Sequence, residues 1–154
     1  MDAIAKRAGV SKETLYRWWR SKTEVVLEAL AQRSLATIPA PDTGSLRGDL
    51  SAFLHATVAS SDRTTRRLLR ALAAEAASDP GFADLVTRQF IATRRASLGE
   101  LLQRGVERDE ISSRQAAIAI DLIYGSLWYR LIFQNAPLDT SWAKDITDTL
   151  APPT

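Results

Sequence analysis

The stretch that decides the fold of this chain reads Ile-Ala-Lys-Arg-Ala-Gly-Val (residues 4–10) followed by Ser-Lys-Glu-Thr-Leu-Tyr-Arg-Trp-Trp-Arg-Ser-Lys (residues 11–22). Its spacing predicts a helix that ends at Ala8, a turn closed by Gly9 at positive φ, and a second helix that begins at Lys12. The hydroxyl of Ser11 is expected to cap the second helix. Two short helices joined by a glycine-containing turn are typical of a DNA-reading helix-turn-helix.

The second helix separates side chains that pack from side chains that face outward. On a helical wheel Leu15 and Trp19 share one arc, while Glu13 and Arg17 lie opposite it. A third, longer helix is predicted over residues 22–37, because Ser-Lys-Thr-Glu before an apolar run has the pattern of a capping box. The two short helices are therefore expected to dock against a longer one.

Charge is distributed unevenly along the chain. Residues 1–22 carry six basic and two acidic side chains, a net charge of +4, whereas the whole chain of 154 residues carries +2. The remainder is thus net acidic, and a basic patch confined to the helix-turn-helix is the pattern expected for attraction to phosphate. The alternative is an ordinary helical hairpin whose basic residues are simply solvated.

The N-terminal helix-turn-helix and the helix after it, which we call the head, resemble the DNA-binding domain of the tetracycline-repressor (TetR) family of one-component regulators. The resemblance is carried by Ile4-Ala5, Ala8-Gly9-Val10-Ser11-Lys12, Thr14-Leu15-Tyr16-Arg17 and Ser21-Lys22. Later patterns resemble a subgroup that shares one kind of C-terminal ligand-binding domain, namely Leu46-Arg47-Gly48-Asp49-Leu50, Asp79-Pro80 and Trp128-Tyr129-Arg130-Leu131. The resemblance implies a ligand-responsive regulator, most commonly a repressor, that binds a palindromic operator in double-stranded DNA as a homodimer.

The resemblance also assigns roles in the head, where the second helix is expected to enter the major groove. The residues expected at the DNA are Ser11, Lys12, Glu13, Thr14, Tyr16, Arg17, Trp18 and Lys22. Of these, Lys12, Glu13, Thr14 and Arg17 are expected nearest the base edges. Tyr16 and Lys22 are expected to hold phosphates, and Trp18 is expected in either group.

Family members normally carry a further N-terminal segment whose first helix braces the helix-turn-helix. Met1 falls almost at the start of the second family helix, so the head is expected to be incomplete, with Ile4, Leu15 and Trp19 partly uncovered. The alternative function is a ligand-sensing or dimerisation module that does not hold DNA.

The rest of the chain predicts an all-α protein, because helical periodicity recurs and strand alternation does not. Two domains are expected, a head over residues 1–37 and a ligand-binding and dimerisation body over residues 42–151, separated by Pro39-Ala40-Pro41. The body helices are predicted over residues 45–60, 62–78, 80–108, 114–135 and 139–150.

The predicted helix at 114–135 is apolar on several sides, with a narrow polar stripe that includes Asp121 and Arg130. Such a helix has to be covered from more than one direction. It is either a central core helix or a helix that also packs against a second copy of the chain. For the second case, the expected interface residues are Leu127, Leu131, Trp142 and Ile146.

A small-molecule cavity between the body helices is implied by the resemblance, for an effector that the sequence does not identify. The candidate lining residues are Phe53, Leu69, Leu72, Phe90, Tyr124 and Trp128. Aromatic residues at helical spacing equally describe ordinary core packing. The lone histidine, His55, lies opposite the apolar arc of its helix and is expected at the surface without a special role.

Other function classes find little support. The chain has no cysteine, which excludes disulfides and thiolate sites, and it shows no glycine-rich phosphate loop or metal-binding motif. Glu75 and Asp79 lie one helical turn apart and could act as an acid–base pair, but such pairs usually belong to a solvated face. We expect no enzyme activity, no cofactor and no metal ion. Asp121 and Arg130 interrupt the longest apolar run, so we expect no membrane span and a cytoplasmic protein.

Overall fold

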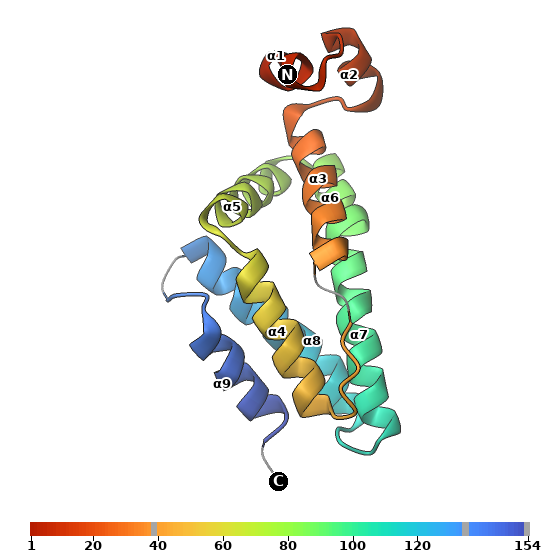
Figure 1. Ribbon diagram of the computed structural model, residues 1–154, viewed down its shortest axis with the longest axis vertical. Helices are drawn as coiled ribbons and strands as arrows, with labels where there is room; N and C mark the ends of the chain where they lie inside the picture. The colour runs from red at the N-terminus through yellow and green to blue at the C-terminus, as the bar shows by residue number, and fades with distance from the viewer. Residues whose placement is uncertain (38–39, 134–135, 153–154) are drawn as a thin grey trace.

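In a computed structural model of the chain, residues 1–37, 40–133 and 136–152 are described, and the regular structure within those ranges is entirely helical (Figure 1). The all-α prediction is confirmed. The helices are α1 (Asp2–Ala8), α2 (Lys12–Trp18), α3 (Lys22–Thr37), α4 (Leu46–Ser60), α5 (Arg63–Ser78), α6 (Pro80–Val86), α7 (Ala92–Glu107), α8 (Ser113–Phe133) and α9 (Thr140–Leu150).

The molecule is elongated, with α1 and α2 forming a head at one end and the C-terminus lying at the other (Figure 1). Helix α3 runs from the head into the body. The predicted helix over residues 80–108 is one continuous rod, except that Thr87–Ile91 forms a π-helical turn, η1, between α6 and α7. The predicted end of α8 at Asn135, and Pro39 of the linker, lie outside the described residues.

Two clusters of buried side chains hold the body together. The larger cluster joins α4, α7, α8 and α9 through residues such as Leu50, Leu98 and Trp142. The smaller cluster joins α3, α5 and α6 and reaches α8 through Leu131. Because α3 contributes Leu27 and Leu30 to the smaller cluster, the helix that carries the head is also a wall of the body.

The Leu46–Leu50 segment is held in place from several sides. Leu46 lies in the larger core cluster. The Arg47 guanidinium binds the Asp148 carboxylate of α9 and the backbone carbonyl of Ala151, which follows α9. Gly48 lies against the loop before α4, where a Cβ atom would overlap Thr43 Oγ1 and lie 3.0 Å from Thr43 Cβ. The contacts of Leu46, Arg47 and Gly48 thus explain why an apolar, a basic and a glycine residue stand at these three positions.

Asp49 is a fully buried carboxylate in this segment. Its Oδ1 accepts hydrogen bonds from the backbone N–H of Thr43 at 2.6 Å and from the Thr43 hydroxyl at 2.8 Å, and its Oδ2 lies 3.1 Å from Arg108 Nη2. Burial alone would raise the pKa of Asp49, but the bonds from Thr43 and Arg108 outweigh burial and hold that pKa below its ordinary value. The carboxylate therefore ties α4 to α7 in its charged form.

The contrast between two glycines gives a direct test of this packing. Gly48→Ala should lower the free energy of unfolding by about 1–3 kcal/mol, because the new methyl group displaces Thr43 and weakens its bonds to Asp49. Gly99→Ala is the matched control, since a Cβ there meets nothing within 4 Å, and it should stabilise α7 by about 0.5–1 kcal/mol. Urea unfolding of both variants measures the difference, and equal effects would contradict the packing argument.

Helix α8 buries one face and exposes another. Ala119, Ile123, Leu127 and Leu131 form the buried face. We call the opposite side the α8 outer face, and its exposed apolar residues are Ile118, Leu122, Tyr129, Ile132 and Phe133. Among the described helices, α8 has the length and the apolar composition of a membrane-spanning helix. Core helices of soluble proteins meet the same two criteria, so this is weak evidence for a membrane span.

The residues predicted for a dimer interface lie largely inside a single chain, and their role in an interface stays a prediction. Leu127, Leu131 and Trp142 are buried inside a single chain, where the Trp142 indole N–H donates to Ser126 Oγ at 3.2 Å. Ile146 is half-buried and packs on the same core cluster. Leu127 and Leu131 lie on the buried face of α8, in the larger and the smaller core cluster respectively, whereas Trp142 and Ile146 belong to α9 and pack in the larger cluster. The apolar residues that α8 leaves exposed are those of the α8 outer face.

Candidate DNA-binding surface and ligand pocket

The helix-turn-helix geometry agrees with its prediction from sequence. Helix α1 ends at Gly9, which adopts φ 67°, in the left-handed region that glycine tolerates best. Helix α2 begins at Lys12, and the Ser11 hydroxyl accepts a hydrogen bond from the backbone N–H of Thr14 at 3.1 Å. Ala5 and Leu15 are the buried contacts of the two helices. The expectation that Leu15 is partly uncovered is therefore wrong, because α1 and α2 bury it, whereas Ile4 and Trp19 are half-buried.

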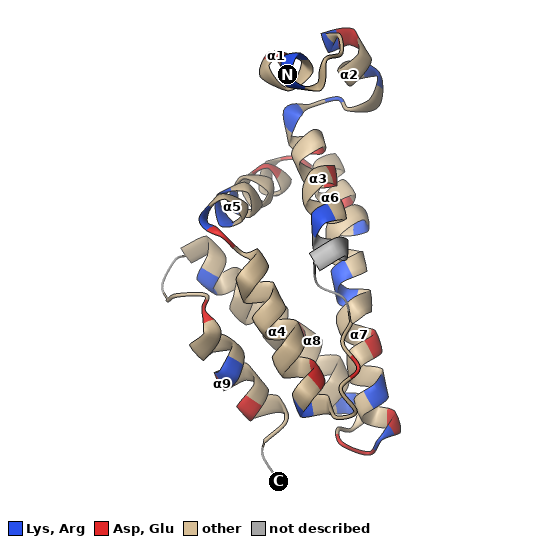
Figure 2. Ribbon diagram, in the orientation of Figure 1, with Lys and Arg blue, Asp and Glu red and all other residues tan. Residues whose placement is uncertain are grey.

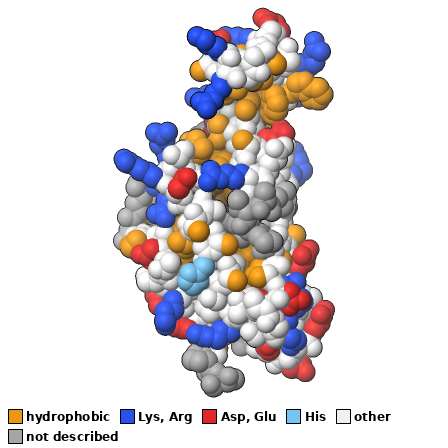
Figure 3. Space-filling model, in the orientation of Figure 1, with side chains coloured by type: hydrophobic (Ala, Val, Ile, Leu, Met, Phe, Trp, Pro, Cys, Tyr) orange, Lys and Arg blue, Asp and Glu red, His pale blue; other side chains and the backbone are white. Residues whose placement is uncertain are grey.

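The side chains predicted to meet DNA lie on the surface of the head. Thr14 is half-buried, and the exposed members are Ser11, Lys12, Glu13, Tyr16, Arg17, Trp18 and Lys22. Trp18 is 73% exposed, which is unusual for an indole. Basic residues mark α1, α2 and the start of α3 (Figure 2), and the head surface shows both basic and apolar side chains (Figure 3). The arrangement offers cations for phosphate and a large aromatic ring beside them.

Lys12 has a partner within the head that the sequence did not reveal. Its ammonium lies 2.9 Å from the Asp2 carboxylate of α1, which holds the pKa of Lys12 above and the pKa of Asp2 below their ordinary values. Both groups are largely exposed, so the pair is weak in water. A DNA phosphate or base edge would compete with Asp2 for this ammonium.

The head is joined to α3 by specific hydrogen bonds. The Trp19 indole N–H donates to Glu28 Oε2 at 2.7 Å, so the predicted packing residue is also an anchor. The Ser21 hydroxyl caps α3 by accepting from the backbone N–H of Glu24 at 3.2 Å. The capping box is altered, however, because the Glu24 carboxylate accepts from the backbone N–H of Arg20 rather than that of Ser21.

Glu75 and Asp79 have structural roles instead of the acid–base geometry considered above. Glu75 Oε1 accepts the hydroxyl of Thr23 at 3.0 Å, which ties α5 to the start of α3. Asp79 Oδ1 accepts the backbone N–H of Phe82 at 3.1 Å and caps α6. His55 is exposed, as expected, and its Nδ1 lies 2.7 Å from the Ser51 carbonyl of its own helix.

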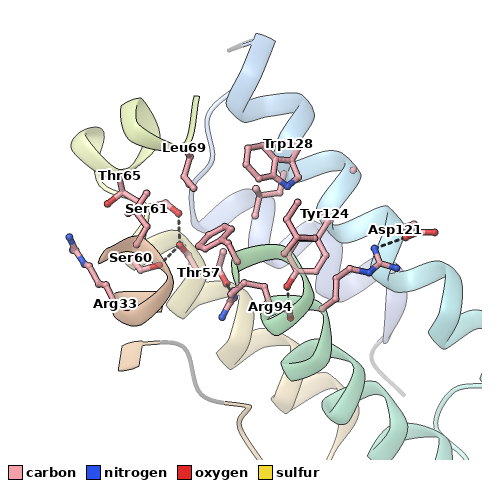
Figure 4. A pocket seen from close by; sticks show the side chains of 16 residues that line it. Arg33, Thr57, Ser60, Ser61, Thr65, Leu69, Arg94, Asp121, Tyr124 and Trp128 are labelled. Atoms are coloured by element: carbon pink, nitrogen blue, oxygen red, sulfur yellow. Dashed lines mark hydrogen bonds and ion pairs between the residues drawn. The ribbon is translucent and has the colours of Figure 1, made fainter. Parts of the chain in front are cut away.

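A cavity of about 380 Å³ lies among α3, α4, α5, α7 and α8 (Figure 4). Four of the six predicted lining residues contribute to it: Leu69, Phe90, Tyr124 and Trp128. The other two do not line it. Phe53 lies behind the wall, with its ring centroid 4.8 Å from the Arg94 guanidinium carbon, and Leu72 is buried in the smaller core cluster.

Several lining residues were missed from sequence because they are polar. Thr57 and Ser61 of the α4 end, Thr65 of α5 and Arg94 of α7 all contribute to the cavity wall. Arg94 is only 6% exposed. A signal existed, because Arg94 precedes Leu98 by four residues and Leu101 by seven, which places it on the apolar face of α7.

The cavity and the head share one helix. Leu30 and Arg33 of α3 line the cavity, while Glu28, within about one and a half turns of both, holds Trp19 of the head. The first residues of α3 include Lys22, a predicted phosphate contact. A molecule placed in the cavity would therefore touch the helix on which the head is mounted.

Family models cover both parts of this arrangement. Residues 1–29 match the model described as "Bacterial regulatory proteins, tetR family", and residues 40–150 match "Tetracyclin repressor-like, C-terminal domain". The chain belongs to the TetR family. It is therefore a TetR-family DNA-binding transcriptional regulator, and the family resemblance seen in its sequence is confirmed.

Similar sequences occur in several bacteria. The chain is 32% identical over 149 residues to the uncharacterized HTH-type transcriptional regulator YdeS of Bacillus subtilis (strain 168), covering 95% of this chain and 74% of that protein. It is 33% identical over 154 residues to the uncharacterized HTH-type transcriptional regulator Rv1556 of Mycobacterium tuberculosis (strain ATCC 25618 / H37Rv), covering 99% and 76%. The HTH-type transcriptional regulator AqdR of Rhodococcus erythropolis is 30% identical over 124 residues, covering 80% and 59%.

A solved structure of the TetR family has the same fold. The crystal structure of the TetR family transcription regulator SCO0332 superposes with a TM-score of 0.87 at 29% identity, covering 99% of this chain and 86% of that one. The likeness extends over head and body together. A TetR-family regulator acts by binding, which agrees with the structural use of Glu75 and Asp79 in this chain.

Proposed function

We propose that this TetR-family regulator is a ligand-responsive repressor that binds a palindromic operator as a homodimer in the cytoplasm. The observation that carries the proposal is the sharing of α3 between the cavity and the head, through Leu30 and Arg33 on one side and Glu28 on the other. Bacterial chromosomal DNA lies in the cytoplasm, so a regulator that binds it is expected there, which supports the cytoplasmic location.

On operator DNA, α2 enters the major groove. Arg17 is exposed in the last turn of α2 and is the residue best suited to hydrogen-bond a base edge, since a guanidinium can bind guanine through two N–H groups. Lys22 is exposed at the first turn of α3, where it meets a phosphate and sets the register of the head. Tyr16, like Lys22, contacts a phosphate of the DNA backbone. Lys12, Glu13 and Thr14 lie with Arg17 nearest the base edges in the major groove.

Two heads are needed to read a palindrome, and the α8 outer face supplies the surface that brings two copies together. Its residues include Leu122, 52% exposed, and Phe133, 70% exposed. An isologous interface across this face buries the apolar stripe of each copy and places the two heads on a two-fold axis.

An effector in the cavity acts through α3. Filling the space beside Leu30 and Arg33 shifts α3, and the Trp19–Glu28 hydrogen bond transmits that shift to α1 and α2. The separation of the two heads then changes, and the effector favours the form that fits the operator poorly. Such coupling requires only that the effector bind the two forms with different affinity.

The test begins with selection of binding sites by this chain from a random duplex library, followed by titration of two head variants. Arg17→Ala should weaken binding by about 1–3 kcal/mol at one base position and relax specificity there. Lys22→Ala should weaken binding to all sequences alike and reduce the slope of log affinity against log salt by about one. The two signatures separate a base contact from a phosphate contact.

The matched control is Arg114→Ala, an exposed cation in the first turn of α8, which should leave specificity and salt slope unchanged. An unchanged salt slope for Lys22→Ala would remove the role assigned to that residue. Failure to recover any palindromic site would overturn the proposal in favour of a sensing or dimerisation module that does not hold DNA.

A further inference from the structure

We propose that the cavity takes an amphipathic acid, a ligand with an apolar body and one carboxylate or similar anionic group, and that Arg94 binds the anionic group. This inference rests on the proposed function, in which the cavity is the effector site. It adds the chemical class of the effector, which the family does not specify.

The first observation is the position of Arg94, a cation in the wall of a largely apolar cavity. Its side chain lies over the Phe53 ring, with 4.8 Å between the guanidinium carbon and the ring centroid. Its Nη2 lies 3.4 Å from Thr57 Oγ1, and its backbone carbonyl accepts the Tyr124 hydroxyl at 2.8 Å. These contacts hold the guanidinium beside the cavity (Figure 4).

The second observation is electrostatic. Burial lowers the pKa of Arg94 from its ordinary value, although a guanidinium remains protonated throughout the physiological range. The water that would solvate this cation has already been removed by folding. An anion that enters the cavity therefore gains a charge-assisted hydrogen bond without the full cost of stripping water from the cation. A guanidinium carries five N–H donors, so it can bind an anion in addition to its partners within the protein.

The third observation is the set of hydroxyl groups in the same wall. Thr57 and Ser61 donate their hydroxyl protons to backbone carbonyls of α4, at 2.9 and 2.7 Å. The Thr65 hydroxyl is buried and has no hydrogen-bond partner in the part of the chain that the structure describes. A buried hydroxyl gains stability when it finds an acceptor. The Thr65 hydroxyl is thus a ready donor to an acidic ligand.

The charge balance of the cavity favours an anion over a cation. Among the described lining residues, the three cations are Arg33, Arg94 and Arg95, and the single carboxylate is Asp121. Asp121 lies 2.9 Å from Arg95, and both are exposed at the edge of the cavity. Asp62, which lies outside the lining, is 3.7 Å from Arg33. Both exposed cations thus have a carboxylate beside them, so the charge that favours an anionic over a cationic ligand is that of the buried Arg94.

The remaining wall accounts for the apolar body of the ligand. It consists of aliphatic and aromatic side chains from α3, α5, η1 and α8, namely Leu30, Leu69, Phe90, Ile91, Leu127 and Trp128. An apolar surface with a few polar groups at defined points is the usual composition of a small-molecule site. The polar groups here set the charge and orientation of the ligand.

The test compares acids with their neutral isosteres by isothermal titration calorimetry. The probes are decanoate against decanamide and 1-naphthylacetate against 1-naphthylacetamide, each titrated into the full chain. We expect at least one acid to bind about tenfold or more tightly than its amide. Equal or tighter binding of the amides, or binding of neither acid, would overturn the proposal.

The variants assign the preference to one residue. Arg94→Gln should bring the acid-to-amide ratio close to one, while Arg94→Lys, which keeps the charge, should retain part of it. Arg88→Gln is the matched control, because it removes the same charge from an exposed position outside the cavity and should leave the ratio unchanged. Circular dichroism checks that each variant is folded. A ratio that persists in a folded Arg94→Gln would exclude Arg94 as the binding group.

Operator binding without any added ligand separates this inference from the proposed function. A chain that binds its operator and releases it with a neutral ligand is a ligand-responsive repressor whose effector is not an acid. A chain that binds no operator fails as a repressor, and the calorimetric preference for acids still decides the charge of the cavity ligand.

Discussion

Asp49→Ala should lower the free energy of unfolding by roughly 3 kcal/mol, because it removes one partner of a buried ion pair. The backbone N–H and hydroxyl of Thr43 lose their acceptor, and Arg104 and Arg108 lose a counter-charge. The expected cost lies at the lower end for buried pairs because both guanidinium groups keep some contact with water. Urea unfolding at pH 7 measures it.

Asp145→Ala is the matched control, since this carboxylate is exposed on α9, and it should change stability by less than about 0.5 kcal/mol. The pH dependence supplies a second check. The pKa of Asp49 is lower in the folded state than in the unfolded state, so its contribution is fully present above the unfolded value of about 4 and is lost as the pH falls through the folded value. The gap between wild type and Asp49→Ala should therefore narrow in acid, and a gap of constant size down to pH 2 would contradict the ionised pair.

Leu122→Glu should convert the proposed dimer into a folded monomer and abolish tight operator binding. Leu122 is exposed on the α8 outer face, and in an isologous interface across this face the new carboxylate is buried together with that of the second copy. Two like charges brought together away from water should cost several kcal/mol. Light scattering of wild type and variant at micromolar concentration, with circular dichroism alongside, measures the change in mass and the retention of helix.

Leu127→Glu provides the contrast on the same helix. Leu127 is buried in the larger core cluster, at the wall of the cavity, so a charge there should destabilise each chain by several kcal/mol and reduce helix content. The pair of variants distinguishes an interface residue from a core residue five positions away. A wild-type chain that is monomeric at micromolar concentration, or a Leu122→Glu variant that remains dimeric, would rule out this interface.

The head was largely predictable from sequence, because its determinants are local. Gly9 and Ser11 act within their own turn, and the structure confirms the positive φ of the first and the capping role of the second. The starts of α4, α5, α6 and α9 follow from single side chains that cap the next helix, as Asp79 does for α6. Such interactions join residues three or four positions apart, so they can be inferred from the amino-acid sequence alone.

The cavity was only partly predictable, because its lining comes from five α-helices and η1 and includes polar groups. The apolar members Leu69 and Trp128 follow from helical periodicity, but periodicity does not distinguish a cavity wall from core packing, as Leu72 shows. Arg94 occupies an apolar face in the sequence, yet only the packing of α7 on α4 shows that its charge is buried beside Thr57. The π-helical turn η1 had no signal in the sequence that we could identify.

By itself, the sequence determined the helical fold, the helix-turn-helix and the family, since these depend on local spacing and on matched motifs. The tertiary structure decided which face of α8 is inside. Its apolar residues surround the helix, so period 3.6 selects no single face, and the choice depends on where α4, α7 and α9 lie against it. For that reason Leu127 and Trp142 are core residues, whereas Ile118 and Leu122 are exposed to solvent.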